Sequence, residues 1–295
     1  MLNLADWNLQ GFKRWRLERE AAALRAEVRA LCPPAAVAAE ALPESLRASW
    51  VQHAQQECPG IRTDPAAWVL TSTALAQFFE CCRLQTDGQA CGLPSKAADM
   101  LWHVALAFEP AALDTWQRQC FGQVVAHRPN AELGCPPDEA IARTWVWACR
   151  SEGRPATASG LPLLFAIDQR LHTPTGWAYA YDPKRCTVGH RDLDAHGRAQ
   201  GAAHYQPALA LSALAAAGLF TAAEQATATN VLEAQTQNAL RRAKADANGA
   251  ASGGACGGSG TSSCGDGGAA CGDGGGSASC GGGASCGGGG CGGGS

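Results

Sequence analysis

The residues whose types and spacing best suit chemistry lie in the segment Asp99-Met100-Leu101-Trp102-His103. On a helix, side chains four positions apart share one face, so the Asp99 carboxylate can orient the His103 imidazole. Such a pair can act as a general base with its orienting group, or belong to the surroundings of a metal. A structural hydrogen bond at a helix–helix contact is the simpler interpretation, and the pattern alone favours it.

A second group of possible metal ligands lies further along the chain, and Asp192 and Asp194 lie within the same segment. The group consists of Cys186, His190, His196 and His204. Four such side chains close together can hold zinc, but their spacing matches no standard zinc finger. Because Gly and Ala dominate the segment, we expect a polar loop with scattered histidines. A nucleophilic Cys186/His190 pair would need a helix, which Gly189 disfavours.

From about residue 248 to Ser295 the chain consists almost entirely of Gly, Ser, Ala and Cys. It has too little apolar surface to offset backbone ordering, roughly 1–2 kcal/mol per residue, so we expect a disordered tail. The tail carries six cysteines, namely Cys256, Cys264, Cys271, Cys280, Cys286 and Cys291. A flexible spacer or interaction segment is the favoured interpretation.

Two other interpretations of the tail stay open. Thiolates bind zinc, Cu(I) and iron–sulfur iron, although the tail lacks the tight C-x-C or C-x-x-C spacing of a chelating site. Alternatively, its Gly-Cys and Ser-Cys runs resemble ribosomal peptides in which Cys and Ser become azoles or thioethers, with the rest of the chain as carrier. Zinc or another soft metal is therefore the one cofactor that these cysteines or the 186–204 group indicate.

The remaining cysteines offer no recognised redox motif. Cys81, Cys82 and Cys91 lie at the end of a predicted helix and in the loop after it. Adjacent cysteines rarely bridge each other, and no C-x-x-C occurs in the chain, so thioredoxin-like chemistry has no motif support. Phosphate-loop, nucleophile-elbow and zincin motifs are absent as well.

The charge balance argues against nucleic-acid and membrane-surface binding. The 295 residues carry a formal net charge of −3, and no basic stripe dominates. Residues 1–30 are interrupted by charges and lack the apolar core of a signal peptide. The longest apolar stretch, residues 207–220, is shorter than the roughly 20 residues that span a bilayer. We therefore expect a cytoplasmic protein without a membrane span.

Helical periodicity dominates the part of the chain that must position these residues. Apolar residues recur three and four apart, and Pro, Gly and capping residues separate the periodic segments. The predicted helices cover residues 4–31, 42–58, 65 to about 82, 95–108, 110 to about 124, 138 to about 149, 162–171, 207–220 and 221 to about 244. Between them, residues 177–181 alternate with period two, which indicates a short hairpin strand.

Four motifs of the helical part follow one another in an order that resembles a known group of proteins. They are Asp99-x-x-Trp102-His103-x-x-Leu106, Phe121-Gly122-x-Val124-Val125-x-His127-x-Pro129, Ala142-Arg143-Thr144-Trp145-x-x-Ala148-Cys149 and Leu161-Pro162-Leu163-Leu164-Phe165. With the Gly/Cys-rich tail, they resemble uncharacterised bacterial helical proteins that are similar to the plant glycine-rich domain-containing protein family. The likeness covers residues 64–171 and the tail. It implies a shared fold, without an established activity.

The chain departs from that pattern at two positions. Ala105 stands where the plant-like motif has a second histidine, and Ala126 replaces one of the paired histidines of the bacterial form. Asp99, His103 and His127 then remain as candidate catalytic residues or metal ligands. Three ligands suffice for an open catalytic site if they converge.

These observations predict a mainly α-helical protein with a small irregular or β-hairpin insert and a disordered Gly/Cys-rich tail. Its expected segments are a helical domain (1–171), an irregular His/Gly-rich segment (172–206), a helical segment (207–247) and the tail (248–295). The favoured function is a non-enzymatic binding or scaffold protein whose helical part docks a protein partner.

Two alternatives to the scaffold stay open. One is a soft-metal-binding protein or a carrier of a modified tail. The other is an enzyme with its site at Asp99, His103 and His127. Convergence of these three side chains on a pocket would favour the enzyme, whereas Trp102 and His103 wedged into helix packing would favour a structural role.

Overall fold

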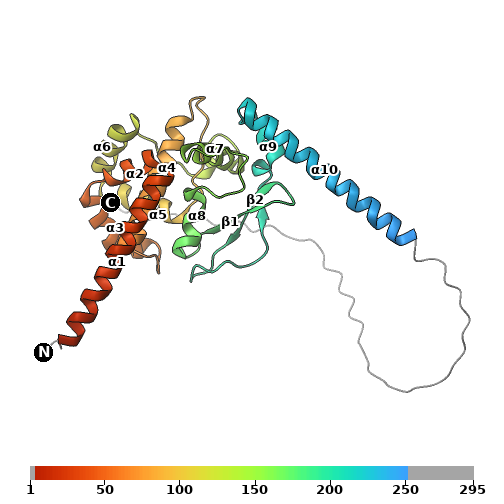
Figure 1. The fold of residues 1–295 in the computed structure, drawn as a ribbon. Coiled ribbons are helices and arrows are strands. Elements are labelled where there is room, and N and C mark those ends of the chain that lie inside the picture. The colour runs from red at the N-terminus through yellow and green to blue at the C-terminus, as the bar shows by residue number, and fades with distance from the viewer. Residues whose placement is uncertain (1–3, 252–295) are drawn as a thin grey trace, which may run out of the picture. The chain divides into compact units, whose positions relative to one another are not determined.

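The structure, a computed structural model, describes residues 4–251 of the chain (Figure 1). Contacts group Met1–Ala245 into one compact unit and Asp246–Ser295 into a second. Residues 248–251, which we expected to begin the tail, still belong to the last helix. The six tail cysteines lie outside the described residues.

Ten α-helices, two 3-10 turns and one three-stranded sheet make up the described residues, which confirms the mainly α-helical prediction. In chain order they are α1 (Leu4–Leu31), α2 (Pro33–Glu40), α3 (Glu44–Glu57), α4 (Pro65–Leu84), α5 (Lys96–Phe108), α6 (Pro110–Phe121), η1 (Asn130–Glu132), α7 (Pro137–Ser151), α8 (Leu163–Leu171), β1 (Trp177–Asp182), β2 (Thr187–Asp192), β3 (His204–Tyr205), η2 (Pro207–Leu209), α9 (Leu211–Ala216) and α10 (Ala222–Ala251). Within residues 4–251, every helix is too short or too polar to cross a lipid bilayer.

Capping side chains fix where two central helices begin. The Asp64 carboxylate accepts hydrogen bonds from two amides in the first turn of α4, at 3.0 and 3.1 Å, and Pro65 fills the first helical position. The Ser95 hydroxyl accepts a hydrogen bond from Ala98 N at 3.2 Å and caps α5. Both helix starts were predicted from these residues and are confirmed.

Two helical predictions need correction. The prolines after α1 end that helix as expected, but Pro33 and Pro34 also begin α2, because the first turn of a helix needs no intrahelical amide donors. Residues 207–220 do not form one buried helix. Pro207 starts the 3-10 turn η2, and α9 ends shortly before Gly218, whose φ of +68° turns the chain.

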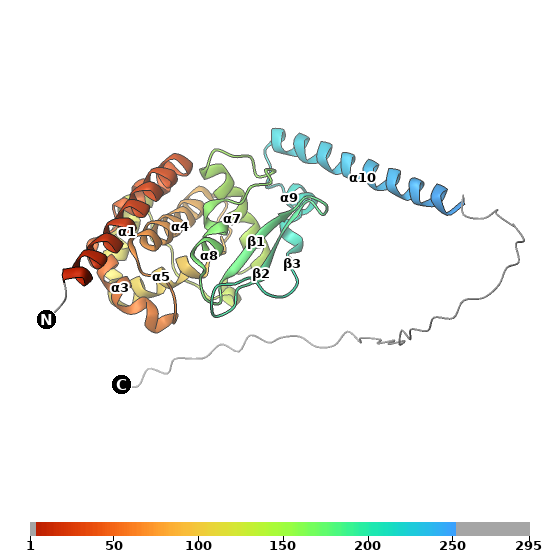
Figure 2. The ribbon, with the colours of Figure 1, turned by 60° about the horizontal axis from the view of Figure 1, so that its bottom comes forward.

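Helix α4 lies at the centre of the core. Every residue from Ala66 to Cys81 is buried, and α1, α2, α5, α7 and α8 pack around the helix (Figure 2). A helix that is mostly apolar on all sides is stable only when other elements surround it. The bulkiest fully buried side chains of the core are Trp50, Trp116, Trp145, Phe79 and Phe165.

The predicted hairpin is confirmed and extended by a third strand. β1 and β2 pair antiparallel with Tyr179 opposite His190, and β3 adds two residues on the free side of β2. The Phe165 ring of α8 and the Tyr179 ring of β1 meet edge to face with centroids 5.0 Å apart. A Cβ at Gly189 would lie 2.9 Å from the Tyr205 ring, so the approach of β3 to β2 requires glycine there.

A capping box at the start of α10, predicted from the sequence, has further partners in the fold. Thr221 N donates to the Glu224 carboxylate at 2.9 Å, and Glu224 N donates to the Thr221 hydroxyl at 3.3 Å. The same carboxylate accepts hydrogen bonds from Arg150 of α7 at 2.7 Å and from Ala156 N at 2.8 Å. Burial alone would raise the pKa of Glu224, but these donors outweigh it and lower the pKa to about 2.

We expect Glu224→Gln to destabilise the protein in a pH-dependent way. A carboxyl whose folded pKa lies below its unfolded value contributes stability that is complete above the unfolded pKa and lost as the pH falls through the folded one. E224Q should lower the free energy of unfolding by about 2–3 kcal/mol at pH 7, and its difference from wild type should shrink between about pH 4.5 and about pH 2. Urea denaturation at several pH values measures this. The exposed Glu57→Gln is the control, and a pH-independent difference for E224Q would contradict the assignment.

A buried carboxylate, Asp168 of α8, connects three elements. Its Oδ1 accepts hydrogen bonds from the Ser95 hydroxyl at 2.9 Å and from Ala97 N at 3.0 Å. Its Oδ2 accepts from Lys96 N at 2.8 Å and from Trp177 N at 3.2 Å. Asp168 therefore fastens the N-terminus of α5 and the first residue of β1 to α8, and the dipole of α5 favours its negative charge.

We expect Asp168→Asn to be strongly destabilising. Both carboxylate oxygens accept two hydrogen bonds each, so an amide in either orientation would set its NH₂ group against donors. D168N should lower the free energy of unfolding by about 2–4 kcal/mol. Chemical denaturation followed by circular dichroism checks this, with the half-exposed Asp114→Asn of α6 as the matched control. A loss no larger than that of D114N would rule out the anchoring role.

Candidate metal centre

Two of the three candidate residues lie on α5, and the third lies on the loop after α6. Asp99 and His103 are one turn apart on α5, as predicted. Helix α6 ends at Phe121, and the next residue, Gly122, turns the chain with a left-handed φ of +73°. The loop after this turn brings His127 into hydrogen-bonding distance of Asp99 and His103.

The position of His127 is fixed from two sides. Val125 N donates a hydrogen bond of 2.8 Å to Oε1 of Gln117, a buried side chain of α6. The imidazole meets the Trp102 ring edge to face, with ring centroids 4.5 Å apart. Because Trp102 is itself buried against Phe79, the core holds the histidine in place.

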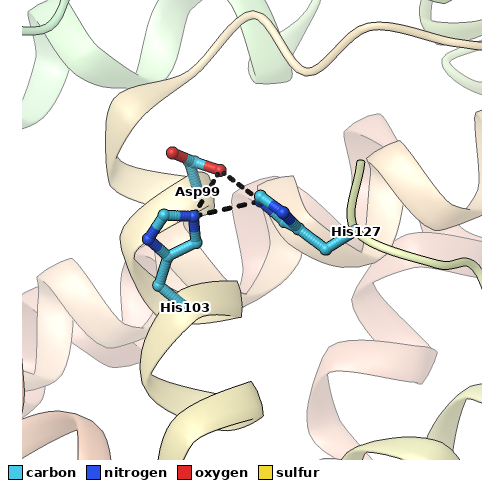
Figure 3. Close-up of side chains that lie close together, drawn as sticks. All are labelled: Asp99, His103 and His127. Atoms are coloured by element: carbon cyan, nitrogen blue, oxygen red, sulfur yellow. Dashed lines mark hydrogen bonds and ion pairs between the residues drawn. The ribbon is translucent and has the colours of Figure 1, made fainter. Parts of the chain in front are cut away.

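The three potential ligand atoms form a compact triangle (Figure 3). His127 Nε2 lies 3.1 Å from Asp99 Oδ1 and 3.1 Å from His103 Nε2, and His103 Nε2 lies 3.6 Å from Asp99 Oδ1. Within residues 4–251, no other group of three His, Cys, Asp or Glu side chains brings its ligand atoms so close together. The structure thus brings together the three residues that the sequence singled out.

Hydrogen bonds alone satisfy this triangle poorly. An imidazole Nε2 carries at most one hydrogen, which can point at one neighbour. If both histidines donate to Asp99, two N–H groups face each other across 3.1 Å. If one histidine donates to the other, the acceptor has no Nε2 hydrogen left for Asp99. A shared cation would satisfy all three atoms at once.

The dimensions of the triangle suit a first-row divalent metal. An ion about 2.0–2.1 Å from each of the three atoms would lie about 0.8 Å out of their plane. In an ideal tetrahedral site the ion lies about 0.7 Å from the plane of any three ligand atoms. The spacing of the three atoms is therefore compatible with one face of a tetrahedral ion.

Electrostatics favour the ionised form of the Asp99 carboxyl. Burial by itself would raise the pKa of this carboxyl. The hydrogen bond with His127 and the charges of His103, His127 and Lys96 outweigh burial, and the net effect lowers the pKa below its ordinary value.

The triangle lies in the wall of a pocket of about 600 Å³. This volume is in the range of small-molecule sites, roughly 300–1,000 Å³. Three aromatic side chains, Phe78, Trp102 and Trp177, also line the pocket, and Trp177 brings β1 into its wall. The ligand side chains keep between 27% and 39% of their surface exposed, so the open side of the site faces solvent.

The zinc cluster considered for Cys186, His190, His196 and His204 is not formed among the described residues. The segment is a hairpin rather than a loop, and a strand spreads such residues apart. Cys186 lies just before β2 and His190 within it, roughly 13 Å further on at about 3.3 Å per residue. This separation also excludes the nucleophilic Cys186/His190 pair. Of the four, His190 and His204 lie together across β2 and β3, with ring centroids 5.6 Å apart.

Two residues that shape the site were not predicted from the sequence. Gln117 shares one helical face with Leu113 and Phe121, four positions away on either side, and a lone polar side chain on such a face was its available signal. Trp177 begins the period-2 segment, but only the packing of the hairpin places it beside the pocket. The tail cysteines lie outside the described residues, so their metal-binding and modification roles stay predictions.

One protein-family model matches the part of the chain that contains this site. The UCP032817-like model matches residues 42–202, more than half of the sequence. The chain belongs to the UCP032817-like family. The matched region begins just before α3 and ends between β2 and β3, so it includes all three candidate ligands. Searches of curated proteins and of solved structures found no match.

Proposed function

We propose that this UCP032817-like protein is a metalloenzyme in which Asp99, His103 and His127 bind one divalent transition metal. The observation that carries the proposal is the triangle of ligand atoms, 3.1–3.6 Å apart, in the wall of a pocket. Two histidines and one carboxylate bind Zn²⁺ in hydrolytic enzymes and Fe²⁺ in non-haem enzymes. Zinc and ferrous iron are therefore the ions that fit this donor set best.

The arrangement suits a catalytic rather than a purely structural metal. Structural zinc sites are closed by four protein ligands, whereas three ligands leave a position for water or substrate. A metal in such a site polarises bound groups and makes bound water a nucleophile near neutral pH. The aromatic side chains beside the site offer an apolar surface for the body of a substrate. We infer metal-assisted hydrolysis of a small molecule as the class of reaction.

The scaffold hypothesis has less support than the enzyme. Burial of both Trp102 and His103 in the packing between helices would support a structural role. Trp102 is packed in that way, but His103 keeps 39% of its side chain exposed and faces Asp99 and His127. Docking of a protein partner, the absence of nucleic-acid binding and a cytoplasmic location remain predictions from sequence, as do the roles proposed for the tail.

Replacement of a ligand should abolish metal binding at this site. We expect purified full-length protein, loaded with Co²⁺, to show the visible d–d absorption of a site with nitrogen and oxygen ligands. His103→Ala and His127→Ala should each weaken this binding by at least about 10–100-fold, because each removes one of three protein ligands. Titration followed by visible absorption measures the affinity, and elemental analysis identifies the metal present after expression.

Two controls separate this site from the other potential ligands. His196→Ala removes an exposed histidine from the turn after β2 and should leave the titration unchanged. Cobalt held by cysteines instead gives intense sulfur-to-metal charge-transfer bands in the near ultraviolet. Cobalt spectra with thiolate bands alone, or equal affinities in wild type and both ligand variants, would refute the proposal.

A further inference from the structure

The loop that carries His127 lines the pocket along its whole length. Every residue from 123 to 129 belongs to the pocket wall. In an extended chain, successive side chains point to opposite sides, so a wall built from one set of side chains would include only alternate residues. Consecutive lining residues indicate instead that the backbone of the loop itself faces the pocket.

The loop is extended where it passes the proposed ligands. Residues 124–129 form no helix, turn or bend, and Pro129 restricts the residue before it to extended backbone angles. Exposure alternates along this stretch: Val125 and His127 are half-buried, and the residues between and beside them are exposed. Such alternation is the pattern of a strand with one covered face. We refer to residues 124–128 as the edge segment.

One side of the edge segment is already paired, and the other is free. Val125 N donates a hydrogen bond of 2.8 Å to the Gln117 side chain, which lies outside the pocket wall. Backbone groups of successive residues in an extended chain point to opposite sides, so those of Val124 and Ala126 point away from Gln117. Within residues 4–251, the amides and carbonyls of Val124 and Ala126 make no hydrogen bond. The free side is therefore a row of donors and acceptors that faces the pocket.

We propose that the substrate of this pocket is an extended peptide that pairs with the free side of the edge segment. Main-chain hydrogen bonds to an exposed strand edge are a general way of binding extended peptides. Phe78, Trp102 and Trp177 in the pocket wall offer an apolar surface for the side chains of such a peptide. Because His127 belongs to the edge segment, the paired peptide passes next to the proposed metal.

The inference names the substrate of the proposed metalloenzyme, so cleavage of the peptide rests on the proposed function, whereas its binding does not. In the reaction, the oxygen of a metal-bound water forms a bond with a peptide carbonyl carbon, and the C–N bond breaks. The water oxygen stays on the new carboxylate, and both water protons pass to the leaving nitrogen. One amide and one water thus give one carboxylate and one ammonium group, without any change in oxidation state.

Binding of a capped hexapeptide to the full-length protein tests the pairing without metal and without cleavage. The parent peptide alternates alanine and phenylalanine, and isothermal titration calorimetry measures its affinity for metal-free protein. Two control peptides carry N-methyl groups, one on its alanines and the other on its phenylalanines. Only alternate residues of a paired strand face its neighbour. We therefore expect one methylated peptide to bind at least about tenfold more weakly than the parent, and the other to bind about as tightly.

Ala126→Pro tests the free side from the protein. This variant removes an N–H on the free side and should weaken binding of the parent peptide about 3–10-fold. Ala195→Pro is the matched control and should bind the peptide as wild type does. Ala195 is exposed and follows Asp194 in a turn closed by the hydrogen bond of 3.0 Å from Gly197 N to Asp194 O, where proline fits. Equal affinities of A126P and A195P would contradict the pairing.

The methylated peptides decide the proposal with wild-type protein alone, so the test does not require a variant to fold. Equal affinities of the two methylated peptides would overturn the proposal, as would failure of the parent peptide to bind. Peptide binding by metal-free protein in the expected pattern supports the inference even if the cobalt titration fails. Cobalt binding without peptide binding would overturn the inference and leave the metal site intact.

Discussion

The arrangement of the pocket depends on one buried carboxylate. Asp168 receives four hydrogen bonds from the start of α5 and from the first residue of β1. Such a group is costly to bury unless every lone pair is matched, so each of these donors must stay where it is. Asp99 lies only one turn beyond the anchored end of α5, and Trp177 is itself one of the donors. The carboxylate thus sets the place of one proposed ligand and of one aromatic wall of the pocket.

The second constraint is the burial of α4. Because this helix is enclosed along most of its length, α5 and α7 have little freedom to shift against it. Helix α5 carries Asp99 and His103, so the candidate metal centre is supported by this core.

Local signals were enough to predict most of the fold. Caps at Asp64, Ser95 and Thr221 mark helix starts because a side-chain oxygen must satisfy free amides there. The prolines before α2 were misread as a stop only, although proline also suits a first turn. Residues 207–220 were apolar enough for one helix, but Pro207 and Gly218 limit helical hydrogen bonding. The buried leucines are therefore divided between the 3-10 turn η2 and the short helix α9.

Part of the geometry of the candidate site could be predicted from the sequence. Helical spacing of four residues placed Asp99 beside His103. His127 was named as a candidate, but its position next to them depends on the turn at Gly122 and on the hydrogen bond to Gln117, and spacing along the chain does not give that position. The cluster at 186–204 failed for the opposite reason, since residues near in sequence are far apart on a strand.

The separation of the proposed ligands along the chain has a consequence for local motion. Asp99 and His127 are 28 residues apart, and α6 lies between them. An ion that joins the two would close this segment into a loop, much as a covalent cross-link does. It would reduce the conformational entropy that the segment gains on local unfolding. The amide hydrogens of α6 would then exchange with solvent more slowly in the metal-bound protein, so a helix that supplies no ligand would report occupancy of the site.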